Sequence, residues 1–328
     1  MAVVVTGASG HVGGALVRAL LAEGAEVRAL VRSDVRPLGG LDVEVVRVDL
    51  ADRQGLGRAF RGAEVVYHAA AQISLEVGPD AATEEVNVRG TRNVVDACRG
   101  AGVRRLVHFS TAQALGDDGQ ELRRFAADPR QGLAYDRSKV DAERVVLDGA
   151  ATDLDAVVVS PCAVVGPPDH KPSYMGRVLL WLARRRLPAT VAGGQSWVDV
   201  RDVALAAVAA ARVGVRGERY VIGGHWLPLA ELAVLACRAA GVAPPPFRVP
   251  RALASAFAPM VATVLRGLGH DPLFTRGSLE QLQDRPRPLD ARAGSVLGHR
   301  PRPIETTLAD AYAWFEAQGM LAPQRRAR

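Results

Sequence analysis

Tyr135 and Lys139 stand four residues apart, a spacing that places both side chains on one face of a helix. The chain has 5 tyrosines in 328 residues, and its two lysines are Lys139 and Lys171, so such a pair is expected by chance about 0.03 times. A phenol has a pKa of about 10, and a nearby ammonium group lowers it by favouring the phenolate. The pair therefore predicts proton transfer between Tyr135 and a carbonyl or alcohol oxygen whose carbon gains or loses hydride.

Ser110 and Thr111 offer hydroxyl groups that could hold the substrate oxygen. Both follow the predicted strand Arg105–Phe109, and α/β proteins place their sites at the carboxyl ends of strands. We predict that Thr111 anchors the oxygen, although a hydroxyl that merely ends a strand explains such a pair equally well when taken alone. The His, Cys, Asp and Glu residues do not have the spacing of metal ligands, so no metal site is expected.

A glycine-rich turn follows the first predicted strand. Glycines at positions 7, 10 and 13 allow a tight strand-to-helix turn, close approach of the backbone to a pyrophosphate, and close packing of the next helix. The N-terminus of that helix presents N–H groups and the positive end of its dipole to a phosphate. The turn therefore predicts a dinucleotide site, formed by Thr6, Gly7, Ser9, Gly10, His11, Val12 and Gly13.

The residues at the end of the second predicted strand favour NADP as the dinucleotide. That strand ends at Val31-Arg32, where an acidic residue would bind a ribose 2′-hydroxyl; the guanidinium of Arg32, with Arg36 nearby, suits a 2′-phosphate. NAD stays open, because Arg32 could be an ordinary surface arginine and Asp34 could contact a ribose. Asp49 follows the third strand, where its carboxylate could accept from the adenine amine or cap the next helix.

Alternating strands and helices must position these residues. Valine-rich runs separated by helical patterns predict βαβ units and a parallel sheet that is buried on both faces. The expected fold is α/β, a Rossmann-type doubly wound parallel sheet with a smaller, mostly helical C-terminal substrate lobe. We predict strands at Ala2–Val5, Glu26–Val31, Val43–Val48, Glu64–His68, Arg105–Phe109 and Ala156–Ser160, and helices at His11–Ala22, Ala82–Ala101, Ala134–Leu147 and Ile304–Ala317.

A domain boundary is predicted near Gly166, where proline and glycine become frequent. Residues 1–165 would form the NADP-binding domain and residues 166–328 the substrate-binding lobe. A return of the chain to the first sheet is expected at about 197–222, through strands at Trp197–Val200 and Arg219–Ile222.

The composition, 48% hydrophobic and 23% charged with a formal net charge of +6, is that of a globular protein. Scattered arginines and an aromatic content of 5% argue against nucleic-acid binding. Three cysteines without a Cys-x-x-Cys spacing fit a reducing cytoplasm. We expect no signal peptide, because the first strand begins at Ala2, and no transmembrane segment, because the longest apolar stretch, Ala252–Leu265, is too short.

An ordered set of motifs spans nearly the whole chain. Its members are Thr6–Gly13, Asp49-Leu50, His68–Ala71, Asn87–Asn93, Ser110-Thr111, Tyr135–Lys139, Pro161–Pro167, Val198–Ala204 and Leu297–Pro301. This set resembles the extended short-chain dehydrogenases/reductases, the NAD-dependent epimerase/dehydratase family. The runs Asp169–Arg177 and Tyr312–Phe315 resemble its dihydroflavonol-4-reductase-like subgroup, which includes proteins called hopanoid-associated sugar epimerases.

The resemblance implies a role for each matching residue. The three glycines would hold the pyrophosphate and Arg32 the 2′-phosphate, and Lys139 would also bond the nicotinamide ribose. Thr111 falls on the family's catalytic Ser/Thr position. The implied cofactor contacts further include Asp49 and Leu50 at the adenine, Ala69, Ala70, Ala71 and Ser110 along the cofactor, and Pro161 and Val164 beside the nicotinamide. A homodimer through the helices Ala82–Ala101 and Ala134–Leu147 is the family expectation.

Two departures concern the substrate. Dehydratases of the family carry Asp-Glu directly after the Ser/Thr, where this chain has Ala112-Gln113. Sugar-nucleotide epimerases carry a diphosphate-binding arginine where this chain reads Gln195-Ser196-Trp197. Both departures point away from sugar nucleotides and towards an apolar carbonyl substrate. Residues that could line its pocket are Gln72, Gln113, Tyr174, Met175 and Trp197, each with a core or surface position as the alternative.

The apolar helix between Arg251 and Arg266 has three interpretations: a buried helix, a lid over an apolar substrate, or a face for peripheral membrane contact.

For the whole chain, the favoured function is NADPH-dependent reduction of an apolar ketone or aldehyde. The alternatives are a sugar epimerase or a 3β-hydroxysteroid-dehydrogenase-like enzyme with tightly bound NAD(P), and a non-catalytic NADPH-sensing module. The intact pair of Tyr135 and Lys139 argues against the sensor, which needs no acid.

Overall fold

The computed structural model describes residues 2–74, 78–114, 133–267, 275–283 and 291–321. The chain divides into two compact units. The first contains residues 1–162, 200–223 and 287–300, and the second contains residues 163–199, 224–286 and 301–328. The division therefore falls three residues before the predicted boundary. The segment 287–300, which the sequence pattern did not assign to the first unit, belongs to it.

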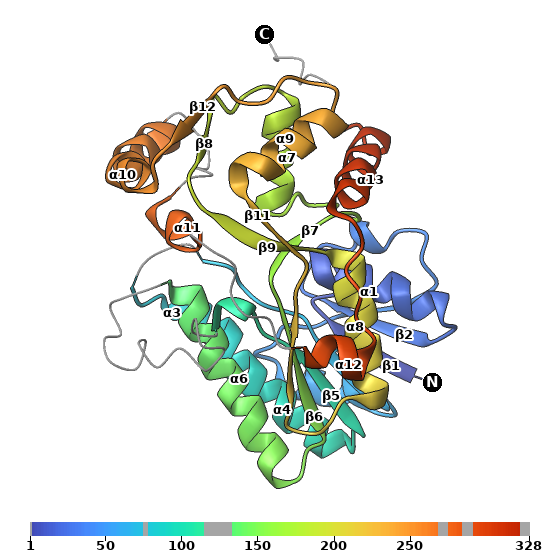
Figure 1. The fold of residues 1–328 in the computed structure, drawn as a ribbon. Coiled ribbons are helices and arrows are strands. Elements are labelled where there is room, and N and C mark those ends of the chain that lie inside the picture. Colours follow the sequence, from blue (N-terminus) through green and yellow to red (C-terminus); the bar gives the residue numbers. More distant parts are fainter. Residues whose placement is uncertain (1, 75–77, 115–132, 268–274, 284–290, 322–328) are drawn as a thin grey trace. The chain divides into compact units, whose positions relative to one another are not determined.

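A seven-stranded parallel sheet forms the centre of the first unit (Figure 1). Its strand order, β10-β6-β5-β4-β1-β2-β3, reverses direction at β1 and β4, which is the Rossmann-type arrangement. The predicted fold class is thus confirmed for this unit. The strands are β1 (Ala2–Thr6), β2 (Glu26–Val31), β3 (Glu44–Arg47), β4 (Val65–His68), β5 (Arg105–Phe109), β6 (Ala156–Pro161) and β10 (Arg219–Ile222).

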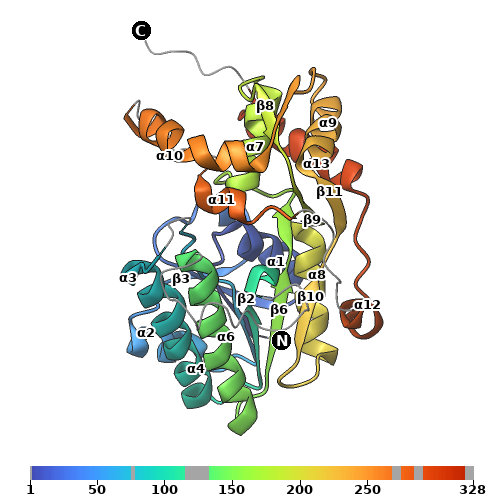
Figure 2. The same ribbon diagram turned by 60° about the vertical axis from the view of Figure 1, so that its left-hand side comes forward.

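Helices cover both faces of this sheet, as the valine-rich strands require. On one face α1 (His11–Ala22) packs against α8 (Val200–Val213), which in turn contacts α12 (Arg292–Leu297). The opposite face carries α2 (Arg53–Phe60), α4 (Gly90–Ala101) and α6 (Ala134–Thr152), which lie side by side in Figure 2. Between β4 and α4 the chain forms the short α3 (Ala81–Glu84) and the π-helical η2 (Glu85–Arg89). Short 3-10 turns occur at η1 (Arg36–Leu38) and η3 (Ala112–Ala114).

The core between the sheet and the second helical face is made mostly of aliphatic side chains, with one phenyl ring. Val4 and Leu106 of the sheet pack there with Leu56 and Phe60 of α2 and with Val146 of α6, and all five are fully buried. Burying side chains of this size contributes about 1.5–3 kcal/mol each. This packing holds the helices rigidly enough to position polar residues at their ends.

The second unit is built from helices and two small sheets. Strands β7 (Ala163–Val165), β9 (Gly194–Asp199) and β11 (His225–Pro228) form one sheet, and β8 (Ala189–Val191) pairs with β12 (Phe247–Val249) in the other. The expected return of Trp197–Val200 to the large sheet is wrong, because Trp197–Asp199 pairs with β7 and β11. The helices are α7 (Tyr174–Ala183), α9 (Leu229–Ala239), α10 (Arg251–Gly267), α11 (Arg276–Glu280) and α13 (Ile304–Ala317).

Arg105 fastens the start of β5 to the C-terminal end of α8. Its guanidinium donates to the carbonyl oxygens of Ala210 and Gly214 at 3.2 and 2.9 Å, and to the carboxylate of Asp155 at 2.7 Å. Cations are favourable at a helix C-terminus, and these carbonyls have little access to water. Arg105 is therefore a structural residue.

Replacing Arg105 by Met should lower the free energy of unfolding by about 2–3 kcal/mol, because buried acceptors lose their donor. The matched change is Arg53→Met, since exposed Arg53 pairs with Asp96 at the surface and should cost less than about 0.5 kcal/mol. Urea denaturation of both variants measures the difference. Equal losses in the two variants would contradict this role of Arg105.

Candidate active site

The carboxyl ends of the parallel strands gather the candidate residues at one edge of the first sheet. β1 runs into the glycine turn after Thr6, β4 ends at His68, and β5 ends at Phe109 before Ser110 and Thr111. Because the sheet order reverses between β1 and β4, this edge contains the topological switch point at which open α/β sheets bind ligands.

The glycine turn has the geometry of a phosphate cradle. Gly7 has φ +68°, and a Cβ there would lie 2.6 Å from the Cα of Ala70. A Cβ on Gly13 would lie 2.1 Å from the carbonyl oxygen of Gly7, so the helix can approach the turn this closely only with glycine. Gly10 is the N-cap of α1 and contributes no side-chain cap. The backbone N–H groups of this N-terminus are suited to a pyrophosphate, so the residues present fit a dinucleotide.

A line of buried hydrogen bonds connects the ends of β1 and β4 with α4. The Thr6 hydroxyl lies 2.8 Å from Nδ1 of His68, and Nε2 of His68 lies 3.0 Å from the hydroxyl of Thr91. Thr91 also donates to the carbonyl oxygen of Asn87. Burial and the Lys139 charge lower the pKa of His68 to about 3, so its ring is neutral and serves as a fixed hydrogen-bonding link.

A second set of bonds ties the loop after β4 to the start of α6. The Asn87 amide donates to the carbonyl oxygen of Gln72 at 2.9 Å and to the Ser138 hydroxyl at 2.8 Å, and its oxygen accepts from the Gln72 N–H at 2.7 Å. Ser138 donates to the carbonyl oxygen of Tyr135. Through these contacts, the first turn of α6 is held in place against the segment that follows His68.

Tyr135 lies half-buried in the first turn of α6. Burial raises the pKa of its phenol, and the neighbouring carboxylate of Asp136 raises it further. The sequence-based expectation was the reverse, a pKa lowered by Lys139. Desolvation dominates because the phenolate would lose its hydration in this position. The phenol is therefore fully protonated at neutral pH in the described structure.

Lys139 is buried one helical turn later. Its Nζ donates to the carbonyl oxygen of Phe109 at 2.5 Å, at the end of β5. Desolvation lowers the pKa of Lys139 to about 8, while the negative charge of Glu143 opposes the shift. The rings of His68 and His108, both buried and held neutral by lowered pKa values, are close enough for the Lys139 charge to act on them.

Glu143 and Arg219 are the polar residues that sequence reasoning missed. The Glu143 carboxylate is buried, accepts a 2.5 Å hydrogen bond from the Ser110 hydroxyl and forms an ion pair with Arg219 of β10. The available signal was the position of Glu143 four residues after Lys139, on the same helix face. No local pattern could have paired it with Arg219, which is 76 residues away.

The two hydroxyls after β5 have different surroundings. Ser110 donates to Glu143, which turns its hydroxyl towards the interior. The oxygen of Thr111, a residue that is also buried, accepts from the backbone N–H of Gln113 at 3.2 Å. Ser110 is thus engaged in the buried ion-pair network, which leaves Thr111 as the better candidate for contact with a substrate oxygen.

The residues predicted for the adenosine end lie after β2 and β3. Arg32 is exposed directly after β2, whereas Arg36 is engaged by Asp34, which accepts from its guanidinium at 2.9 and 2.7 Å. Asp49 accepts from the Ala51 N–H, and the N-cap of α2 is Asp52, so the alternative that Asp49 caps this helix is wrong.

Leu50 packs close to Gly90, where a Cβ would lie 2.9 Å from the leucine side chain. The carbonyl oxygen of Leu50 accepts from the Asn93 amide. These contacts with α4 fix the segment predicted to lie against the adenine.

The remaining predicted residues divide between the units. In the first, Ala69 and Ala70 bond back to Thr6, Ala71 is exposed, and Pro161 ends β6. In the second, Val164 lies in β7 and Tyr174 begins α7.

The structure favours the core alternative for two pocket candidates of the second unit. Met175 and Trp197 are buried in its hydrophobic core, and the Trp197 indole donates to the carbonyl oxygen of Leu227. His170 contacts the Trp314 ring edge to face. Among the described residues, no three His, Cys, Asp or Glu side chains could hold a metal ion together.

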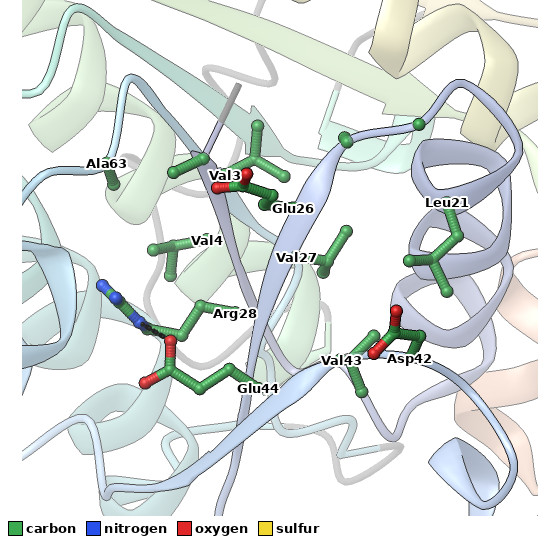
Figure 3. Close-up of a pocket in the computed structure, with 13 residues that line it drawn as sticks. Val3, Val4, Leu21, Glu26, Val27, Arg28, Asp42, Val43, Glu44 and Ala63 are labelled. Carbon is green, nitrogen blue, oxygen red and sulfur yellow. Dashed lines mark hydrogen bonds and ion pairs between the residues drawn. The ribbon is translucent and has the colours of Figure 1, made fainter.

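A hollow at the amino ends of β1 and β2 lies at the opposite edge of the first sheet (Figure 3). Val3, Glu26 and Val27 line it, and an ion pair of Arg28 with Glu44, 2.7 Å long, closes one side. Open α/β sheets bind ligands at the carboxyl ends of their strands, so this hollow is not the dinucleotide site.

Comparison with known proteins identifies the family. A model described as the NAD dependent epimerase/dehydratase family matches residues 3–223. The chain belongs to this family. NAD(P) is the cofactor typical of epimerase/dehydratase proteins, which agrees with the glycine turn.

Relatives within the family cover almost the whole chain. Sterol demethylase protein B of Methylococcus capsulatus is 37% identical over 98% of this chain and 100% of its own. A protein of Synechocystis sp. that carries the name of a dihydroflavonol 4-reductase is 35% identical over 98% and 96%. The crystal structure of gox2253, 33% identical, superposes with a TM-score of 0.82 over 98% and 99%. Further relatives are named as reductases, among them a 2-alkyl-3-oxoalkanoate reductase and a ceramide reductase.

The lowered pKa of Lys139 has a measurable effect on stability. Its folded-state pKa is about 8 against an ordinary value of 10.5, so the folded protein binds fewer protons than the unfolded chain between these values. The buried ammonium therefore destabilises the fold below about pH 8, and the penalty disappears as the pH rises towards the unfolded value.

The variant Lys139→Met removes this titration. The stability of the parent protein relative to the variant should rise by roughly 2–3 kcal/mol between about pH 7 and about pH 10. Urea denaturation of both proteins at the two pH values gives the difference. A parallel pH dependence of the two proteins would show that Lys139 does not titrate in this way.

Proposed function

We propose that this protein is an NADPH-dependent reductase of an apolar ketone or aldehyde. The main support is that the glycine turn, Thr111 and the first turn of α6 lie at one edge of the first sheet. The backbone of Tyr135 is held there by hydrogen bonds through Ser138 and Asn87. Bound NADPH would supply the hydride. Gly7, Gly10 and Gly13 would hold its pyrophosphate through backbone N–H groups.

Tyr135 acts as the proton donor to the carbonyl oxygen. Its raised pKa keeps the phenol protonated at neutral pH, which is the form that reduction requires. Thr111 orients the same oxygen from the end of β5. The buried ammonium of Lys139 on the same helix stabilises the phenolate that proton transfer leaves behind.

Residue types at two positions support an apolar substrate. Ala112-Gln113 replace the acid–base pair of dehydratases, and Gln195-Ser196 supply no cation for a diphosphate. The names of relatives support the same class, since they refer to a sterol, a 2-alkyl-3-oxoalkanoate and a ceramide. A second candidate, oxidation of a 3β-hydroxysteroid, is favoured by the name of the sterol demethylase relative.

Tyr135→Phe tests the proton donor. The variant should lose about 10²–10⁴-fold in kcat because the proton has no other positioned source, whereas NADPH binding should be unchanged. Absorbance at the NADPH band over a panel of apolar ketones and aldehydes measures turnover, and fluorescence titration measures binding. The matched variant Tyr220→Phe removes a buried hydroxyl that bonds to Val215 and should keep kcat. Retained turnover in Tyr135→Phe, or turnover with sugar nucleotides alone, would refute the proposed reaction.

Arg32→Ala tests the preference for NADP. Arg32 is exposed at the end of β2 and Arg36 is engaged by Asp34, so we assign the 2′-phosphate to Arg32. Loss of a charge-assisted hydrogen bond should weaken NADPH binding roughly 10- to 100-fold and leave NADH binding unchanged. Arg61→Ala, an exposed arginine before β4, serves as the control. An equal effect on NADPH and NADH would overturn the assignment.

A further inference from the structure

The helix α10 exposes a continuous apolar stripe. Leu253, Phe257, Met260 and Val261 are 51, 51, 60 and 44% exposed, although the side chains are large and hydrophobic. At 100° per residue these four positions fall on one side of the helix, whereas buried Ala258 and Ala262 fall on the other. The alanine side is the inward face, and α10 contacts α11 within the second unit, as Figure 2 shows. The stripe is thus an exposed apolar face of α10 without a packed neighbour among the described residues.

A further aromatic side chain lies next to this helix. Phe247 of β12 is 68% exposed, and β12 is separated from α10 by Pro250 alone. Exposed apolar residues that occur singly need no explanation, but five within fifteen residues form a patch of the kind that marks an interaction site.

The segment that contains β12 and α10 is basic. Residues 232–270 contain no aspartate or glutamate, and they contain four arginines, Arg238, Arg248, Arg251 and Arg266. This segment therefore carries +4 of the chain's formal net charge of +6. Arg238 and Arg248 are exposed, the latter directly after Phe247.

We propose that the apolar stripe of α10, together with Phe247, docks on the surface of an anionic lipid bilayer. An exposed apolar helix face in a basic segment offers a membrane interface two attractions, since aromatic and aliphatic side chains can enter the acyl chains while exposed guanidinium groups meet the phosphates. The inference is independent of the proposed reductase activity.

Charge decides between a bilayer and a second copy of this chain. A twofold contact would bring two copies of the basic segment 232–270, each with a formal charge of +4, next to one another. An anionic bilayer instead supplies both an apolar interior and negative headgroups. No helix among the described residues is long and apolar enough to cross a membrane, so the contact is with the bilayer surface.

Flotation of the purified full chain with vesicles tests this docking. We expect binding to vesicles of phosphatidylcholine with phosphatidylglycerol to be at least about tenfold stronger than to phosphatidylcholine alone, and to weaken as salt is added. The double variant Phe257→Asp, Met260→Asp should abolish binding, and Arg248→Gln should weaken it about fivefold. These side chains are exposed, so the variants should fold, which circular dichroism checks.

The matched control is Leu205→Asp, which places the same charge at a leucine of α8 that is 51% exposed and should leave vesicle binding unchanged. Absence of binding to the anionic vesicles, or equal binding by the double variant, would overturn the proposal. A change of sedimentation coefficient in the double variant without lipid would do so as well, because the stripe would then be a contact between copies.

Discussion

A buried ammonium group is the most demanding feature of the first unit. Lys139 is removed from water, and an isolated charge in such a place costs several kcal/mol unless it is compensated. The fold compensates it with the carbonyl oxygen of Phe109 and with the negative charge of Glu143 one turn further along α6. Even so, the pKa of the group falls to about 8, which shows that the compensation is incomplete.

Glu143 brings its own requirement, because a buried carboxylate also needs partners. Ser110 at the end of β5 and Arg219 of β10 supply them, so one ion-pair network connects two strands to α6. The candidate site therefore depends on contacts between α6, β5 and β10, and not on α6 alone. The partners that offset the free-energy cost of the buried ammonium come from parts of the sheet that are far apart in sequence. The geometry around Tyr135 is therefore a consequence of the whole first unit.

Neutral groups do the remaining positioning. His68 bridges Thr6 and Thr91 without a charge, and Asn87 uses both its amide nitrogen and its oxygen to join Gln72 to Ser138. Neutral hydrogen bonds suit this task, because they fix direction without adding a further buried charge to the neighbourhood of Lys139. The second unit follows a different principle: its core is apolar, and its polar surface is interrupted by the stripe of α10.

The sequence by itself determined the fold class and the positions of all seven strands of the central sheet, because valine-rich runs and glycine spacing are local signals. It also identified the glycine turn and the pair Tyr135 and Lys139, whose spacing lies within one helix. What the tertiary structure decided depends on burial and on distant partners. The pKa of Tyr135 is raised because desolvation and the neighbouring charge of Asp136 act in the same direction. Trp197 belongs to a core and a small sheet of the second unit, and Glu143 meets Arg219 from 76 residues away. Local patterns record which groups are present, but the free energy of a group depends on what surrounds it after folding.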